Sequence, residues 1–209
     1  RGNHRSHVLP PVILWAWERP EDLRFIDPGR EGVAYLAATI ALSGDRISLH
    51  SRQQQLQVPD GTTLVAVVRL ETDRNDRPVL SDGQRSAVAG IISRIGSIPA
   101  HAAVQIDFDA LTSERAFYRA LLHEVRGRLP ASVILSITAL ASWCTGDPWI
   151  AGLPVDEAVP MLFRMGADRA AVLARLQAGA DFSLPICRAS VGISTDELRP
   201  RLPADRRIY

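Results

Sequence analysis

The sequence predicts an α/β fold, specifically a small (β/α)8 TIM-like barrel with a hairpin excursion after its second strand. Eight apolar strand candidates follow one another along the 209 residues, with helices or short connections between most of them. Several of these strands carry polar residues at their C-terminal ends, which form the active-site mouth of such a barrel. The length is close to the lower limit of about 200 residues for this fold. The alternative is an open, doubly wound sheet, but no Gly-x-Gly-x-x-Gly pattern follows the first strand.

Turn residues divide the first part of the chain into three strands and a hairpin. Arg19-Pro20 and Ser43-Gly44-Asp45 end the first two strands, and Pro59-Asp60-Gly61 precedes the third. A stretch of alternating polar and apolar residues lies before that last turn and predicts a surface hairpin. Apolar residues then recur at helical spacing. The predicted elements are strands 12–18, 32–42 and 63–71, hairpin 46–58, and a helix over about 81–98.

The fourth strand, residues 101–110, has the most unusual pattern in the chain. Strands of a parallel sheet are covered on both faces and are normally apolar throughout. Here apolar residues on one face alternate with polar residues on the other. The apolar face holds Val104, Ile106 and Phe108, and the polar face holds Gln105, Asp107 and Asp109.

The position of these polar residues indicates a site. Burying carboxylates is unfavourable by several kcal/mol unless they are paired or solvated, and the C-terminal end of a buried strand offers solvent. We therefore expect Phe108 and its apolar neighbours to face the helices, with Asp107 and Asp109 facing inward at the mouth. The alternative is that the two aspartates cap the next helix or pair with an arginine.

The second half of the chain continues the alternation of strands and helices. A helix with apolar residues at helical spacing follows the fourth strand, and an alanine- and leucine-rich helix precedes Gly179. Pro160 is expected near the start of its strand rather than at its centre. The predicted elements are helix 112–129, strand 132–143, strand 158–166, helix 168–178, strand 187–194 and a short strand 206–209. We expect residues 1–11 to form an N-terminal tail and residues 12–209 a single barrel domain.

Composition and charge exclude several classes of protein. The 24 basic and 23 acidic residues nearly cancel, and the arginines are scattered, so we expect no nucleic-acid partner. All of the basic residues are arginine, which excludes a Schiff-base or phosphate-loop lysine. No apolar run approaches the length of about 20 residues that spans a membrane. We expect no cofactor, and the sequence leaves the oligomeric state open.

The two cysteines, Cys144 and Cys187, are predicted to be free thiols. The first follows the end of the fifth strand and the second begins the seventh, which places them at opposite ends of a barrel. That separation exceeds the limit of about 7 Å between Cα atoms that a disulfide allows. The histidines and cysteines show no zinc spacing, so no metal site is predicted from them.

Four segments of the sequence resemble the bacterial domain of unknown function family 3142, a TIM-barrel, glycoside-hydrolase-like family. They are Trp15-Ala-Trp-Glu-Arg-Pro20, Gln105-Ile-Asp-Phe-Asp-Ala110, residues 135–144 and residues 153–166. The fourth strand is also distantly similar to the Asp-x-Asp-x-Glu strand end of family 18 chitinases. Gln105 stands at the first Asp, Asp107 at the second and Asp109 at the catalytic Glu. Because two of the three positions differ, the resemblance implies a barrel with a carboxylate at this point and does not extend to substrate-assisted chitinase chemistry.

Carboxylates at the strand ends favour glycoside hydrolysis, which generally uses two carboxyl groups on either side of the scissile bond. Asp109 is predicted to be the general acid, with Asp107, Glu18 or Glu71 as its neighbour or partner. Aromatic and polar side chains at the same strand ends are candidates for binding sugar, although core packing is an equal alternative for each tryptophan. The predicted substrate-binding residues are Trp15, Trp17, Arg69, Gln105 and Trp143.

The function predicted from the sequence is hydrolysis of an envelope or extracellular polysaccharide by carboxylate acid/base catalysis. Two alternatives stay open, namely a barrel that binds glycan without cleaving it and a metal-assisted hydrolase built on Asp107, Asp109 and Glu71. Whether the protein is an enzyme is therefore undecided at this stage. We expect a periplasmic or secreted location with an export signal outside this sequence, and a cytoplasmic location stays open.

Overall fold

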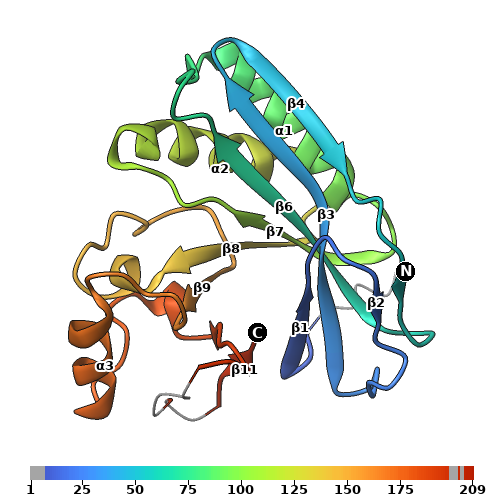
Figure 1. The fold of residues 1–209 in the computed structure, drawn as a ribbon, viewed down its shortest axis with the longest axis vertical. Coiled ribbons are helices and arrows are strands. Elements are labelled where there is room, and N and C mark those ends of the chain that lie inside the picture. Colours follow the sequence, from blue (N-terminus) through green and yellow to red (C-terminus); the bar gives the residue numbers. More distant parts are fainter. Residues whose placement is uncertain (1–7, 198–201, 203–204) are drawn as a thin grey trace.

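Eight parallel strands form a nearly closed barrel in the computed structural model, which describes residues 8–197, 202 and 205–209 (Figure 1). The strands pair in the order β10-β11-β1-β3-β6-β7-β8-β9. A parallel bridge between Met161 and Gly192 joins the two ends of this series and completes the ring. The strands are β1 (Val12–Ala16), β3 (Glu31–Ser43), β6 (Thr63–Thr72), β7 (His101–Asp107), β8 (Ile134–Leu140), β9 (Glu157–Met161), β10 (Ser190–Val191) and β11 (Arg207–Ile208). The predicted barrel is therefore confirmed.

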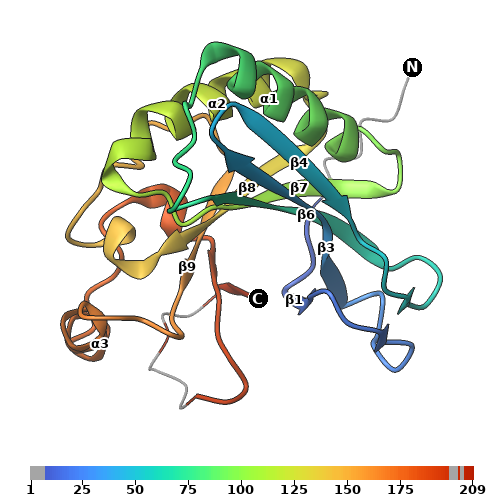
Figure 2. The same ribbon diagram turned by 45° about the horizontal axis from the view of Figure 1, so that its top comes forward.

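Helices cover only part of the barrel. Helices α1 (Asp82–Gly96) and α2 (Arg115–Arg128) pack side by side over one face of the sheet, while α3 (Arg169–Gln177) lies apart from them (Figures 1 and 2). Helix α1 begins with a capping box in which Ser81 and Gln84 each bond the other's backbone N–H. In the described residues, 3-10 turns lie at Thr112–Glu114, Ala141–Cys144 and Pro185–Cys187. In the described part of the chain no helix has the length and apolar character to span a membrane.

Short strands replace helices on the side of β1 and β3. The strands β2 (Glu21–Asp22) and β5 (Leu56–Gln57) pair in parallel and bring two long connections together. Apolar residues of these connections pack on the outer face of β1 and β3. They cover the face that a crossover helix covers elsewhere in such a barrel. This outer cluster contains Leu14, Ala16, Leu23, Ile26, Val33, Tyr35, Leu56, Val58 and Leu64.

A hairpin does follow the second barrel strand, as predicted, but its two strands are β3 and β4 rather than the two halves of residues 46–58. Strand β4 (Arg46–Ser51) runs antiparallel to the C-terminal half of β3, from Ala38↔Ser51 to Ser43↔Arg46. Strand β3 contains a bulge at Ala37, where its register against β6 shifts by one residue. Before the bulge Leu36 belongs to the barrel interior, and after it Ile40 belongs to the layer beneath the helices.

The apolar core has two layers, one inside the barrel and one between the barrel and the helices. Val104, Ile106 and Phe108 lie in the outer layer, and the Phe108 ring meets the Tyr118 ring of α2 edge-on at 5.1 Å. The prediction that Phe108 faces the helices is therefore confirmed. The inner layer consists of Leu9, Ile13, Ala34, Leu36, Val65, Val67, Ala102, Ala103, Val159 and Tyr209, with Trp15 and Ile134 beside them.

Two strand predictions near the C-terminus are wrong in their limits. The sixth barrel strand, β9, begins at Glu157 and ends at Met161, so Pro160 is its fourth residue rather than an early one. Proline has no N–H to donate, so it fits a strand only where its nitrogen faces no ladder partner. The Pro160 carbonyl accepts from Gly192 N at 2.9 Å, so the nitrogen of Pro160 faces the same side, where β9 pairs only through one bridge. The seventh strand is only Ser190–Val191, and the residues from 187 to 189 are not extended.

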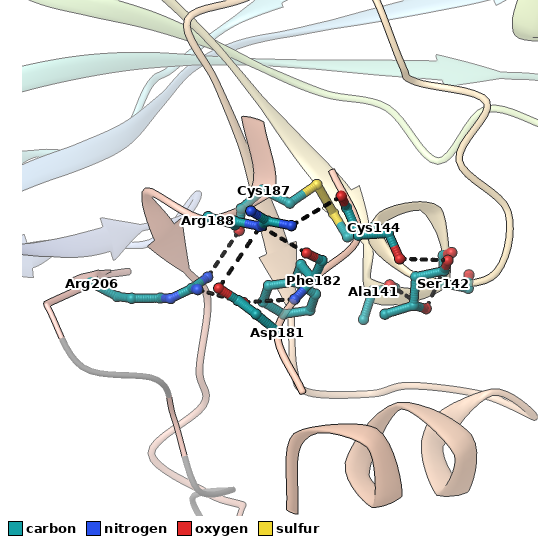
Figure 3. The surroundings of a disulfide bond; sticks show 10 residues. Ala141, Ser142, Cys144, Asp181, Phe182, Cys187, Arg188 and Arg206 are labelled. Atoms are coloured by element: carbon teal, nitrogen blue, oxygen red, sulfur yellow. Dashed lines mark hydrogen bonds and ion pairs between the residues drawn. A yellow bond between two sulfur atoms is a disulfide. The ribbon is translucent and has the colours of Figure 1, made fainter. Parts of the chain in front are cut away.

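The prediction of free cysteines is also wrong, because Cys144 and Cys187 form a disulfide with a Cα–Cα distance of 5.9 Å (Figure 3). Cys187 ends a 3-10 turn before β10, so it does not lie at the bottom of a long seventh strand. The chain after α3 returns to the end of β8, where Ser183 N donates to the Cys144 carbonyl at 2.8 Å. The two cysteines therefore meet at the same end of the barrel.

Reduction of this disulfide should lower the free energy of unfolding by about 4 kcal/mol, because the bond closes a loop with a sequence separation of 43. Urea unfolding with and without reductant measures the difference. The double variant Cys144→Ala/Cys187→Ala is the control and should not respond to reductant. Two reactive thiols in the unfolded, unreduced protein would contradict the bond.

Candidate active site

The polar residues of β7 point into the barrel and rise toward its mouth. Gln105 is fully buried in the interior, Asp107 ends the strand and is half-buried, and Asp109 is exposed two residues later. Alternation along the strand places all three on the face opposite Phe108. The structure therefore brings the predicted polar face of this strand to the C-terminal mouth.

Asp107 has surroundings that raise the pKa of its carboxyl group. Its Oδ1 accepts a hydrogen bond of 2.7 Å from the Thr138 hydroxyl on β8. Burial raises the pKa of Asp107, and the negative charges of Asp109 and Glu71 raise it further. The Thr138 hydrogen bond and the positive charge of Arg69 oppose this shift but do not reverse it.

A pocket of about 270 Å³ opens between the ends of β6 and β7. Asp107 and Asp109 line it from one strand, and Arg69 and Glu71 line it from the other. Arg69 Nε donates to Glu71 Oε1 at 2.8 Å, and both side chains are about half exposed. Four of the residues predicted from the sequence therefore share one pocket.

Asp109 has no structural role that would explain its charge. Among the described residues it forms no ion pair, and the following 3-10 turn begins without a side-chain cap. The carboxylate of Glu114 accepts the Leu111 N–H at 2.8 Å instead. The alternative of a helix cap or an arginine pair for Asp109 is therefore not supported.

A chain of buried hydrogen bonds forms the floor beneath the pocket. Trp15 Nε1 donates to Gln105 Oε1 at 2.8 Å, and Gln105 Nε2 donates to the Ser136 hydroxyl at 3.0 Å. Ser136 in turn donates to Glu157 Oε1 at 3.0 Å. The neutral Gln105 thus fixes the Trp15 indole from β1 against strands β7 and β8.

Glu157 is a buried acid that the sequence analysis missed. It is 3% exposed, accepts the Tyr209 hydroxyl at 2.6 Å, and forms an ion pair of 2.6 Å with Arg207. Burial and the Glu157 carboxylate raise the pKa of Tyr209. The signal was present in the sequence, because Glu157 starts an apolar strand, just as Asp107 ends one.

Aromatic residues gather on the side of the mouth formed by β1. The Trp15 ring lies 6.3 Å from that of Trp17 and 5.9 Å from that of Phe163, which it meets edge-on. Gly192 permits this contact, because a Cβ there would lie 2.6 Å from Trp15 Cη2. Trp17 is 37% exposed and presents part of its ring to solvent.

Three of the predicted site residues do not join the site. Gln105 is fully buried, and its amide is already bonded to Trp15 and Ser136. Glu18 turns toward the connection after β4, where its Oε1 accepts the backbone N–H groups of Gln53 and Gln54 at 3.2 and 3.1 Å. Trp143 is 2% exposed and packs edge-on against Trp149 at 5.0 Å in the core. It therefore has no face available to a ligand.

The carboxylates of the mouth are not arranged as a metal site. Within residues 8–197, 202 and 205–209, no three His, Cys, Asp or Glu side chains converge closely enough to hold an ion. Arg69 lies among the acidic residues and forms an ion pair with Glu71. Glu71 is one of the three residues that the metal hypothesis requires as ligands, and its carboxylate is bound to Arg69 instead.

Solved structures with a similar fold are chitinase-like barrels. The spore cortex-lytic enzyme SleL of Bacillus cereus matches with a TM-score of 0.56 and 18% identity over 87% of this chain and 50% of that one. The chitinase domain of the spore coat protein CotE of Clostridium difficile matches with a TM-score of 0.55 and 13% identity, over 90% and 66% of the two chains. The chitinase RmChi1 of Rhizomucor miehei matches at 0.52 and 10%, over 87% and 68%.

At these identities the likeness shows the fold alone, so the chain is a TIM barrel like these three structures. It spans half the length of SleL and about two thirds of each chitinase chain. No curated protein matches the sequence. The chain belongs to the family described as Domain of unknown function (DUF3142), whose model matches residues 60–174.

Replacing Asp107 with Asn should raise the free energy of unfolding at neutral pH by roughly 0.5 to 2 kcal/mol. Because the folded state raises the pKa of Asp107, it binds this proton more tightly than the unfolded chain, whose aspartates titrate near about 3.9. The resulting stabilisation is complete below that pH and is lost as the pH rises through the folded-state pKa. The variant should lose this part of the pH dependence in urea unfolding measured from pH 3 to pH 8. Asp60→Asn, which changes an exposed aspartate outside the pocket, is the control. A drop in stability at neutral pH would show that the charge of Asp107 is structural.

Replacing Glu18 with Ala should destabilise the protein by about 1 kcal/mol, because two backbone N–H groups lose their charged acceptor. Glu18→Gln retains an acceptor oxygen and should have a smaller effect in the same thermal unfolding experiment. Equal effects of the two substitutions would mean that these hydrogen bonds contribute little.

Proposed function

We propose that this protein is a glycoside hydrolase that acts on an envelope or extracellular polysaccharide at the C-terminal mouth of its barrel. The observation that carries the proposal is the pair of carboxyl groups on β7. Asp107 is half-buried with a raised pKa, and Asp109 lies on the same face in the adjoining pocket. Hydrolysis by acid/base catalysis requires one carboxyl group that holds a proton at the working pH.

In this proposal Asp109 contacts the glycosidic oxygen because it is exposed and lines the pocket. Asp107 supports it from below as the neighbouring carboxyl group with the raised pKa. Burial makes Asp107 the carboxyl group whose surroundings favour the protonated form. Arg69 and Glu71 complete the charge pattern, and Glu71 is the remaining candidate for the second carboxylate because Glu18 is bound elsewhere.

Similarity of fold supports the same reaction class. Two of the similar structures are chitinases and the third is a spore cortex-lytic enzyme. Chitin is a glycan, and the mouth of this barrel has polar groups that can bind the hydroxyl groups of such a polymer. The Trp15 and Trp17 rings on the β1 side support the proposal further, because aromatic faces provide apolar contact area at low entropic cost.

The disulfide supports a location outside the cytoplasm. Cys144 and Cys187 are both fully buried and bonded, and such bonds persist in the periplasm or outside the cell. A periplasmic or secreted protein would meet envelope or extracellular polysaccharide directly.

A barrel that binds glycan without cleaving it is the second candidate. The observation in its favour is the state of Gln105, which stands where family 18 chitinases have Asp. Its amide is hydrogen-bonded to Trp15 and Ser136. A neutral residue at that point leaves one carboxylate fewer than the chitinase strand end. The experiment below separates the two candidates.

Asp109→Asn should reduce turnover of a cleaved polysaccharide by 10²- to 10⁴-fold, because acid–base assistance contributes that factor. Release of reducing ends from chitin, peptidoglycan and secreted bacterial exopolysaccharide measures turnover. Stability should change by less than about 0.5 kcal/mol, since Asp109 is exposed and unpaired among the described residues.

Glu18→Gln is the matched control, because it neutralises a carboxylate outside the pocket without removing its acceptor oxygen. It should retain wild-type turnover. Glycan binding by the wild type without release of reducing ends would favour the binding barrel. Cleavage that survives Asp109→Asn would contradict the proposed catalytic role.

A further inference from the structure

Strands β3, β4 and β6 continue beyond the end of β1 and form a wall beside the mouth. Strand β1 pairs with β3 only as far as Tyr35, and β4 takes its place from Ala38 onward. Helix α1 lies over one face of these strands and contacts β4 and β6 (Figure 2). The opposite face continues the surface that carries Asp107.

Burial identifies the side chains that point toward the helices. Ile40 and Leu42 of β3 and Val68 and Leu70 of β6 lie in the core beneath the helices, and Ile47 of β4 packs against it. Alternation therefore turns the residues between them toward the open face. The open face carries Thr39, Ala41 and Ser43 of β3, Ser48 and His50 of β4, and Arg69 and Glu71 of β6.

Strand pairing aligns four of these polar residues in one row. His50 is the partner of Thr39, Thr39 is the partner of Arg69, and Arg69 is the partner of Asp107. We call His50, Thr39, Arg69 and Asp107 the polar row. Its members are exposed or half-buried, so their side chains are open to solvent.

The length of the polar row suits a polymer. Three strand spacings separate His50 from Asp107, a distance of about 14 Å across the sheet. A single monosaccharide cannot bridge that distance, whereas several linked sugar rings can. The row ends at the carboxyl group to which the proposed function assigns a catalytic part, so a polymer lying along it would pass the reacting atoms.

The charges of the row indicate an uncharged polymer. Arg69 lies at its centre, and the pocket at its end is lined by Arg69 and Arg74 together with the carboxyl groups of Asp107, Asp109 and Glu71. The opposite charges nearly balance, so neither a polyanion nor a polycation gains a strong net attraction there. Hydroxyl groups of a neutral sugar both donate and accept hydrogen bonds, which matches a surface that offers an imidazole, a hydroxyl, a guanidinium and a carboxyl group.

We infer that the polar row binds an uncharged, unbranched polysaccharide and that Thr39 and His50 form a distal sugar subsite. This inference rests on the proposed function, because it uses the same mouth and the same Asp107. It assigns the hairpin β3–β4 a role in selecting long substrates over short ones.

The test compares His50→Ala and Thr39→Val with the wild type on a long and a short oligosaccharide. Chitin hexasaccharide and chitin disaccharide, each with a chromogenic reducing end, are the probes. Each substitution should raise KM for the hexasaccharide about three- to tenfold, as loss of one hydrogen bond does, and should leave kcat unchanged. KM for the disaccharide should not change, because it cannot reach His50.

Leu49→Ala is the matched control, because Leu49 neighbours His50 on β4, pairs with Ile40 and faces the other side of the sheet. It should leave both KM values unchanged. Melting temperatures of all variants establish that the fold is intact. Calorimetric titration with the same two oligosaccharides gives the corresponding Kd values independently of turnover.

The outcomes separate this inference from the proposed function. Equal KM and Kd values of wild type and His50→Ala for the hexasaccharide would overturn the polar row even if the protein is a hydrolase. The same holds if both oligosaccharides weaken equally, or if an acidic polysaccharide binds while the hexasaccharide does not. A length-dependent Kd without any turnover would support the row and contradict the hydrolase.

Discussion

The buried charge of Glu157 is the constraint on which closure of the barrel depends. The last two strands contribute only two residues each, so backbone pairing alone fixes them weakly. Arg207 on β11 compensates by pairing with Glu157 across the interior, and its Nε also donates to the Pro10 carbonyl at 3.0 Å. Loss of either charge would leave the other buried and unpaired, which typically destabilises a protein by about 3 to 5 kcal/mol. The hydrogen-bonded floor under the pocket continues from this same carboxylate.

The sequence was sufficient for those features that depend on local pattern. Alternation within β7 predicted that Phe108 faces the helices and Gln105 the interior, because successive side chains of a strand point to opposite faces. The hairpin after the second strand followed from its own alternation. Features that depend on contacts between distant segments were not predictable in this way. The disulfide joins Cys144 to a turn whose position is set by the path of the chain after α3, and no local signal at Cys187 reveals that path.

The candidate site shows the same division. A polar residue at a strand end indicates the mouth, and this was enough to bring Arg69, Glu71, Asp107 and Asp109 into one pocket. It does not indicate the direction of the chain beyond the strand. Strand β1 ends at Ala16, so Glu18 already belongs to a connection that turns outward.

The bulge at Ala37 decides which side chains of β3 face the open side of the wall and which face the helices. If Ala37 were an ordinary paired position of the strand, strict alternation from Leu36 would turn Ile40 and Leu42 to the open face and Thr39 beneath the helices. An alignment of related sequences that treats Ala37 as an ordinary strand position would therefore exchange the two faces for every residue from 38 to 43. Conserved apolar residues would then be mistaken for ligand contacts, and the polar ones for core. Related chains can be compared across this strand only if the additional residue is first located in each of them.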